Sequence, residues 1–278
     1  MATISAAEVK KLKDLTNAGM MDCKKALEES DGDMDKALKL LKEKGLADAK
    51  KRGDRETKEG GVYIKADGSK VAMILLGCET DFVSGNDLFK AAKDKILDGV
   101  LSTGSEDANK YQDNVQDVIS QTKENIELKK VRFIELKDNQ YAATYIHGNN
   151  KIGVAVVFEL GNSSLKTNGD FKDAAQNVAL HIAACSPFYT SSNEVPAKEI
   201  DEQKEIFLKQ MESDNKPANI KENIIKGKIA KHLAEICLLD QKYVKDDKVS
   251  IQKYIEDTAK KLGSDIKIVK FFRDMVGA

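Results

Sequence analysis

The chain has no tryptophan, and aromatic residues make up only 6% of its 278 residues. No apolar run reaches the roughly 18 residues that a membrane-spanning helix requires. The opening residues contain no apolar stretch and Glu8 follows at once, so they do not resemble a signal peptide. We therefore expect a cytoplasmic protein that makes no contact with a membrane.

Neither sign of charge is in excess, because 45 lysines and arginines stand against 46 acidic residues and leave a net charge of −1. A nucleic-acid-binding protein generally needs a basic surface, so this balance disfavours a direct nucleic-acid partner. The densest basic cluster, residues 50–55, is diluted by acidic neighbours and is typical of a solvated linker.

The sequence also lacks the short motifs that mark common active sites. It contains no H-E-x-x-H, G-x-S-x-G, P-loop or G-x-G-x-x-G motif. Its four cysteines are scattered and form no C-x-x-C pair, which indicates free thiols in a reducing compartment rather than a zinc site. We therefore expect no catalytic residues, no bound cofactor and no metal site. His181, within an apolar helical pattern, is expected to be a hydrogen-bonded core residue.

The first 45 residues carry three short helical patterns. Ser5 and Glu8 have the spacing of a capping box at the start of the first helix. Gly45 is expected to end the third helix. The predicted helices are 5–17, 21–29 and 34–44. A three-helix domain over 1–45 is therefore predicted, followed by a charged segment, 46–59, that is a linker or a loose helix.

Two copies of one arrangement follow, each a hairpin and then a helix. Alternation of apolar and polar residues predicts a hairpin over 62–78, with its turn at Asp67-Gly68, before a helix at 87–98. A second hairpin over 141–160 precedes a helix at 171–184. The fold class is therefore α+β, with a two-subdomain core of small antiparallel sheets packed with helices. The predicted subdomains are 60–139 for the first, and 140–190 together with 239–278 for the second.

Residues 191–238 differ from the rest of the chain. Two apolar stripes at helical spacing are broken at 214–217, which predicts a projecting helical hairpin, or coiled-coil arm. Its other faces are rich in lysine and glutamate. The pattern fits either a solvated structural hairpin or an arm for dimerisation or partner contact.

The connection between residues 78 and 86 carries an aromatic residue in a prominent place. Phe82 directly follows an apolar strand pattern, 71–78, and precedes the helix that begins near residues 86–87. Connections lie at the surface and often carry function. Phe82 therefore either folds back onto its own core or serves as an anchor for a partner protein, as aromatic residues do at interface hot spots.

Three segments resemble a known family. Thr16–Leu27 (TNAGMMDCKKAL), Cys78–Val83 (CETDFV) and His147-Gly148 ahead of Lys151–Val154 are similar to signature segments of bacterial elongation factor Ts, the nucleotide-exchange factor of the translational GTPase elongation factor Tu. The resemblance covers essentially the whole chain. It implies a bundle like the ubiquitin-associated (UBA) domain at the amino terminus, a two-subdomain core and a coiled-coil arm.

The resemblance implies a protein that is not an enzyme but promotes GDP release from elongation factor Tu, so that GTP can bind. The partner would be bound in its GDP-bound and nucleotide-free forms. The residues implied to disturb the partner's Mg²⁺ and phosphate site are Thr80, Asp81, Phe82 and Val83. The residues implied to bind the partner are Met20, Met21, Asn125, Ile126, His147 and Gly148. A homodimer and a 2:2 complex with the partner both remain open.

Two departures from the family pattern concern connections. Lys123 precedes Glu124-Asn125 where Gly-Glu-Asn is common, and Lys242 follows Gln241 where Gln-Pro is common. The first departure puts contacts carried by that glycine in question.

Other interpretations stay open from the residues alone. The Met20-Met21 pair fits either the core of the bundle or an adaptable contact surface, and His147 fits a plain turn residue. An enzyme that uses scattered residues such as His147 and Cys185 is a second functional class. A UBA-type peptide- or protein-binding adaptor without exchange activity is a third.

Overall fold

The computed structural model describes residues 4–16, 18–211 and 217–277. The chain divides into two compact units. The first unit comprises residues 1–135, 148–152 and 274–278, and the second comprises 136–147 and 153–273. Helices and small antiparallel sheets make up both units, which confirms the predicted α+β class. The finer division into five segments stays a prediction. Among the described residues, no helix is long and apolar enough to cross a membrane.

The first unit begins with a bundle of three helices, α1 (Ala6–Thr16), α2 (Met20–Glu29) and α3 (Met34–Arg52). The predicted capping box is present, because the Ser5 backbone N–H donates to Glu8 Oε2 at 2.8 Å and the Glu8 N–H donates to Ser5 Oγ at 3.2 Å. The core of the bundle is small and consists of Leu12, Cys23, Ala26, Leu27 and Ala37. The three predicted helices are therefore confirmed, and the domain bounds 1–45 stay a prediction.

The end of α3 corrects one prediction. Gly45 does not terminate the helix, which continues to Arg52. A single glycine within a helix costs only about 1 kcal/mol relative to alanine. The residues that follow Gly45 are rich in alanine and lysine, which favour helix, and they carry the backbone past this point. Of the two interpretations of 46–59, the helical one therefore holds as far as Arg52.

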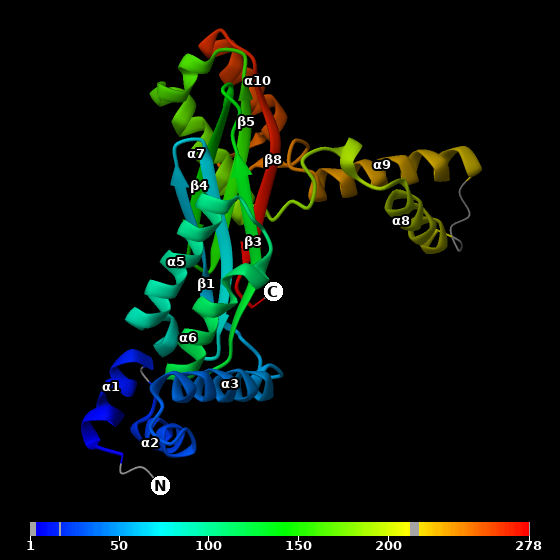
Figure 1. Cartoon of the computed structure of the whole chain (residues 1–278). Helices are drawn as coiled ribbons and strands as arrows, with labels where there is room; N and C mark the ends of the chain where they lie inside the picture. The colour runs from blue at the N-terminus through cyan, green and yellow to red at the C-terminus, as the bar shows by residue number, and fades with distance from the viewer. Residues whose placement is uncertain (1–3, 17, 212–216, 278) are drawn as a thin grey trace. The chain divides into compact units, whose positions relative to one another are not determined.

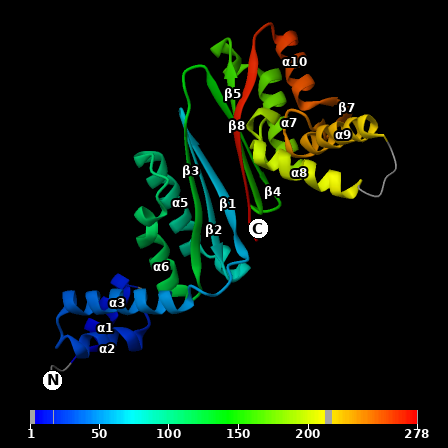
Figure 2. The ribbon, with the colours of Figure 1, turned by 90° about the vertical axis from the view of Figure 1, so that its right-hand side faces the viewer.

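The first sheet has the strand order β1 (Glu59–Asp67), β2 (Lys70–Cys78) and β3 (Ile126–Glu135), all antiparallel. The predicted hairpin turn is confirmed, since Asp67 pairs with Lys70 and Gly68 has a φ of +56°. Figures 1 and 2 show α5 (Asp87–Thr103) and α6 (Gln112–Thr122) along one face of this sheet. A short helix, η1 (Ala108–Tyr111), joins them. Apolar residues of both helices, including Phe89 and Val118, pack with those of β2 in one core.

The second sheet repeats this plan with β4 (Gln140–His147), β5 (Ile152–Leu160) and β8 (Ile266–Met275), in that order. Its hairpin turn places three consecutive residues, Gly148, Asn149 and Asn150, at positive φ. After β5, a short helix, η2 (Ser163–Thr167), leads into α7 (Gly169–Cys185), and α10 (Ile251–Leu262) precedes β8. The predicted repetition of hairpin and helix is confirmed.

The predicted helical hairpin is also confirmed. It consists of α8 (Ala197–Gln210) and α9 (Ala218–Ile236), and η3 (Ser192–Glu194) precedes it. Both helices belong to the second unit, and Figure 1 shows them extending away from the sheet of that unit. The predicted break at 214–217 lies largely outside the described residues. The alternation of apolar residues did not predict the small sheet of β6 (Lys242–Tyr243) and β7 (Asp246–Ser250) that follows.

Candidate functional site

The connection after β2 forms a single helical turn, α4 (Asp81–Ser84), rather than an irregular loop. Thr80 caps it in an extended conformation, and its Oγ1 accepts a hydrogen bond from the Val83 N–H at 3.4 Å. Asn86 caps the next helix, α5, by accepting from the Leu88 N–H at 2.8 Å, which confirms the predicted start of that helix. The strand β2 and the capped helix α5 therefore flank α4 along the chain.

The side chains of α4 point in opposite directions. Phe82 is 86% exposed, and Asp81 is exposed beside it. Val83 is buried and belongs to the core formed by β2, α5 and α6. The ring of Phe82 does not fold back onto its own core, so the interpretation of Phe82 as a core residue is wrong. Val83 instead ties the turn to the unit and leaves the phenyl ring in solvent.

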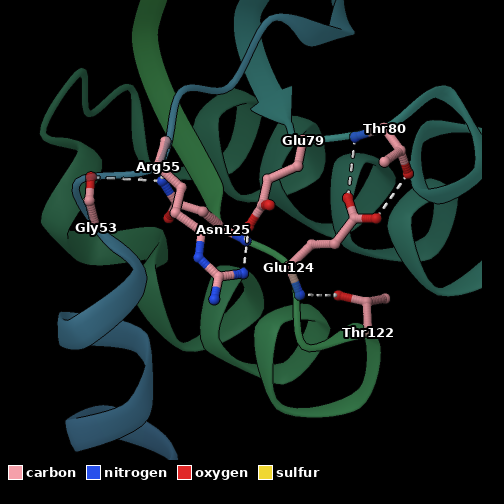
Figure 3. Close-up of polar contacts among 7 residues, drawn as sticks. All are labelled: Gly53, Arg55, Glu79, Thr80, Thr122, Glu124 and Asn125. Atoms are coloured by element: carbon pink, nitrogen blue, oxygen red, sulfur yellow. Dashed lines mark hydrogen bonds and ion pairs between the residues drawn. The ribbon is translucent and has the colours of Figure 1, made fainter.

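A carboxylate from a distant part of the sequence holds Thr80. The Thr80 N–H donates to Glu124 Oε2 at 3.0 Å, and Thr80 Oγ1 donates to Glu124 Oε1 at 2.6 Å (Figure 3). Hydrogen bonds to an ionised carboxylate are stronger than those between neutral groups. Both oxygens of one side chain are therefore used to fix the residue that precedes Asp81 and Phe82.

A second carboxylate makes the reciprocal connection. Glu79 Oε1 accepts from the Asn125 N–H at 2.6 Å and pairs with Arg55 at 3.3 Å (Figure 3). The Asn125 side chain donates to the carbonyl oxygen of Arg55 at 2.8 Å and to that of Gly53 at 3.5 Å. Thr80 and Glu79, which precede α4, are thus bonded to Glu124 and Asn125, which precede β3. Arg55, in the segment after α3, is bonded to both Glu79 and Asn125.

The nearby thiol is structural. Cys78 Sγ donates to the Thr80 carbonyl oxygen at 3.1 Å. Burial raises the pKa of the Cys78 thiol to about 12, and the negative charge of Glu124 adds to this effect. A thiol that stays protonated is a poor nucleophile. Cys78 therefore supports the backbone of the turn rather than offering reactivity.

The other predicted site residues fall into two groups. Met20 and Met21 are 59% and 66% exposed, so neither belongs to the core of the bundle. His147 and Gly148 are exposed at the turn after β4, where His147 Nδ1 and Tyr145 Oη are hydrogen-bonded at 3.0 Å. The remaining two residues, Asn125 and Ile126, are buried. The structure tests no partner contact for any of them, and their binding roles stay predictions.

Lys123, the first departure from the family pattern, lies at the end of α6. It occupies the left-handed region, with φ 61° and ψ 15°, and its N–H donates to the Ile119 carbonyl oxygen. Glycine is the usual residue in this capping position, because a side chain is strained there. The departure therefore concerns the backbone that leads into Glu124.

The predicted site omitted three residues that the structure places around the turn, namely Glu79, Glu124 and Arg55. Thr80 is a residue type that commonly caps helices, so its capping role was open to prediction. The partner of Thr80 lies 44 positions away in the sequence. No local pattern could have identified that partner.

These observations define a class of protein before they define a family. In the part of the chain that the structure describes, no group of three or more His, Cys, Asp or Glu residues is placed to hold a metal ion. The most exposed large apolar side chains are those of Phe82, on the turn held by Thr80 and Glu124, Phe188, the Met20-Met21 pair and Leu15. Exposed aromatic and methionine side chains are typical of protein-binding surfaces. The fold and the site are those of a protein that acts through contact with another protein.

Comparison with known proteins identifies the family. The family model described as "Elongation factor TS" matches residues 79–278. The chain is 41% identical to elongation factor Ts of Borrelia recurrentis over 271 residues, which cover 97% of this chain and 98% of that protein. It is 40% identical to elongation factor Ts of Treponema denticola over 275 residues, which cover 96% of each. The chain therefore belongs to the elongation factor Ts family, and this membership implies a nucleotide-exchange factor for elongation factor Tu in translation elongation.

Proposed function

We propose that this chain binds elongation factor Tu with GDP in the cytoplasm and disturbs its Mg²⁺ and phosphate site through Phe82. The observation that carries this proposal is the 86% exposure of Phe82. The residues around it are fixed, because Thr80 caps the turn and bonds to Glu124, and Val83 is buried. A large apolar side chain held in solvent by a rigid support is suited to enter a partner.

The physical action is mechanical rather than covalent. In GTPases the metal ion bridges protein ligands and the phosphates of the nucleotide. Packed cores switch between discrete arrangements instead of deforming smoothly, so a side chain wedged between two helices displaces groups beyond its own contact. Phe82 would supply the wedge, and Asp81 would compete for polar groups near the metal ligands.

Magnitudes require more than one contact. A thousandfold faster release of GDP corresponds to a barrier lower by about 4 kcal/mol. Burial of one phenylalanine side chain contributes about 1.5–3 kcal/mol. Phe82 therefore needs the binding energy of other surfaces, which hold the partner in place while the ring enters it.

We assign those holding roles to the exposed members of the predicted site. Met20 and Met21 would bind the GTPase domain, since flexible thioether side chains adapt to a partner's surface. His147 and Gly148 would bind another domain of the same partner. Asn125 and Ile126 are buried, so they would act by supporting the turn and the start of β3.

Thermodynamic reciprocity means that this protein would not choose the direction of nucleotide exchange. If this protein weakens the binding of GDP, GDP weakens the binding of this protein to the partner by the same factor. The protein would accelerate exchange both ways, and the excess of GTP over GDP would decide which nucleotide refills the site.

The test is a stopped-flow measurement of labelled GDP leaving elongation factor Tu. Wild type should accelerate release, and Phe82→Ala should reduce the acceleration at least tenfold, an amount equivalent to about 1.4 kcal/mol. Phe188→Ala is the matched control, because Phe188 is also highly exposed, at 78%, but lies in the segment after α7. It should leave release unchanged.

Two outcomes would contradict the proposal. If wild type binds the GTPase without accelerating GDP release, the adaptor function is favoured instead. If Phe82→Ala and Phe188→Ala are equally active, exchange does not depend on the turn at α4.

A further inference from the structure

The tie between Glu124 and Thr80 spans two connections that are remote in sequence. Glu124 accepts both the backbone N–H and the hydroxyl proton of Thr80, at 3.0 Å and 2.6 Å. Thr80 is in turn the cap of α4, and its Oγ1 accepts from the Val83 N–H. One carboxylate therefore controls the backbone and the capping hydroxyl of the residue from which Asp81 and Phe82 extend.

The turn has little intrinsic stability of its own. α4 comprises four residues, and an isolated helical turn is unfavourable because its first hydrogen bond must order several residues. Phe82 and Asp81 are exposed, so of these residues only Val83 anchors the turn in the core. The direction of Phe82 consequently depends on the polar contacts of Thr80 as well as on Val83.

Glu124 is itself held from both sides. Its own N–H donates to Thr122 Oγ1 at 3.4 Å, and the next residue, Asn125, is bonded through its N–H to Glu79 (Figure 3). Directly afterwards β3 begins, with Ile126 paired to Cys78 of β2. The carboxylate of Glu124 therefore projects from a backbone that the sheet fixes, and it does not need a partner protein to be ordered.

We propose that Glu124 is a positioning residue for exchange: it sets the direction of Phe82 through Thr80 without touching the GTPase. This proposal rests on the function proposed above for Phe82. Without the carboxylate, the sheet and the Val83 contact remain, but Phe82 samples more directions. Misplacement of a working group by about 1 Å can cost up to a hundredfold in rate. The loss should therefore appear in the rate of GDP release within the complex, and much less in the affinity of the complex.

The experiment measures GDP release at increasing concentrations of this protein, which separates the saturating rate from the half-saturating concentration. Glu124→Ala should lower the saturating rate by about tenfold or more, while the half-saturating concentration changes by less than about twofold. Glu124→Gln, which keeps one acceptor but no charge, should fall between wild type and Glu124→Ala. Glu127→Ala is the matched control, since Glu127 is a carboxylate three positions along that bonds to Thr57 and Lys129 instead. It should leave both quantities unchanged.

A double variant distinguishes positioning from any other role. If Glu124 acts only through the direction of the ring, Glu124→Ala should cause no further loss in rate when Phe82 is already alanine. Independent losses in Phe82→Ala and Glu124→Ala that multiply in the double variant would overturn the proposal. So would a Glu124→Ala effect confined to the half-saturating concentration, which would indicate a direct contact with the GTPase.

The outcomes also separate this inference from the function on which it rests. If wild type does not accelerate GDP release, the proposed function has failed. If wild type is active and Phe82→Ala is impaired while both Glu124 variants match wild type, only the positioning role has failed. Should Glu124→Ala not fold, Glu124→Gln carries the test, and a saturating rate equal to that of wild type would overturn the proposal.

Discussion

The connections that follow β2 and β5 occupy equivalent places in two similar sheets, yet they present their apolar residues in opposite ways. Each follows the central strand of a three-stranded antiparallel sheet and leads through a short helix into a long one. In the first connection Phe82 is 86% exposed, whereas in the second Leu165 is only 6% exposed. The architecture alone therefore does not decide whether such a residue is buried or displayed.

The difference lies in what orders each turn. In η2, Asn162 caps its own turn by accepting from the Ser164 N–H at 3.0 Å, and the burial of Leu165 orders the rest. In α4 the capping residue, Thr80, is itself bonded to Glu124. Packing of Leu165 therefore orders η2, whereas in α4 the packing of Val83 is supplemented by charge-assisted hydrogen bonds to Thr80.

The largest difference between the two turns should appear when Leu165 and Phe82 are each truncated to alanine. Leu165→Ala should lower the free energy of unfolding of the second unit by about 2–4 kcal/mol, because it leaves a cavity. Phe82→Ala should change stability by less than about 0.5 kcal/mol, because the ring is already in solvent. Both changes in the free energy of unfolding can be measured by chemical denaturation, with hydrogen exchange in peptides from each unit as the probe. Equal losses from the two substitutions would mean that the two turns are ordered in the same way.

The helices that follow these two turns differ in one buried side chain, and pH should reveal it. α7 buries His181 completely, whereas the buried residues of α5 are all apolar. His181 Nδ1 accepts from the Val244 N–H at 3.1 Å, so Nε2 carries the proton and donates to Gln241 at 3.0 Å. The predicted core role of this histidine is confirmed. Burial lowers the pKa of His181, although the Gln241 contact partly opposes this.

Mild acid should therefore weaken the second unit. Below the unfolded pKa of about 6.5, the unfolded chain binds a proton that folded His181 does not, so the free energy of unfolding falls as pH falls, by up to about 1.4 kcal/mol per pH unit. Unfolding measured between pH 7.5 and 5.5 should show this slope in wild type and a smaller one in His181→Gln. His147→Gln, which alters an exposed histidine, is the control. Identical slopes in wild type and His181→Gln would exclude this origin.

The first unit should respond at a lower pH, through a different group. The Asp274 carboxylate is fully buried against Lys130 and Arg132. Burial by itself would raise the pKa of Asp274, but hydrogen bonds from Arg132 and Lys130 outweigh it and hold that pKa below its usual range. The stability that this ion pair contributes is present above the unfolded pKa of about 3.9 and is lost as pH falls through the lower folded value. Between pH 7.5 and 5.5 it stays constant.

Local signals were sufficient to predict most of the fold. The hairpins follow from alternation of apolar residues around Asp67-Gly68 and Gly148–Asn150, and α5 begins where Asn86 can cap it. Predictions failed where several weak preferences compete. At Gly45 one unfavourable residue was outweighed by the helix formers after it.

The site could be predicted only in part, for a different reason. Glu124 bonds to Thr80, the residue that caps the turn carrying Phe82, and only the folded chain brings these two residues together. Glu79 lies within one of the segments that resemble the family, and Glu124 follows the departure at Lys123. The pairing of Glu79 with Asn125, and of Glu124 with Thr80, nevertheless requires the β2–β3 register. Spacing along the chain contains no information about that register.

The smallest predicted change in the free energy of unfolding concerns Lys123, whose backbone leads into Glu124. α5 ends with Gly104 in the left-handed region, whereas α6 ends there with Lys123, which has a side chain that strains this conformation. Lys123→Gly should therefore raise the free energy of unfolding of the first unit by about 0.5–1 kcal/mol. Lys123→Ala removes the same side chain but keeps the strain, and it should leave stability unchanged. Because Glu124 remains in place, the saturating rate of GDP release should stay at the wild-type value in both variants. A stabilisation by alanine equal to that by glycine would show that the lysine side chain, and not its backbone conformation, is what the helix end tolerates poorly.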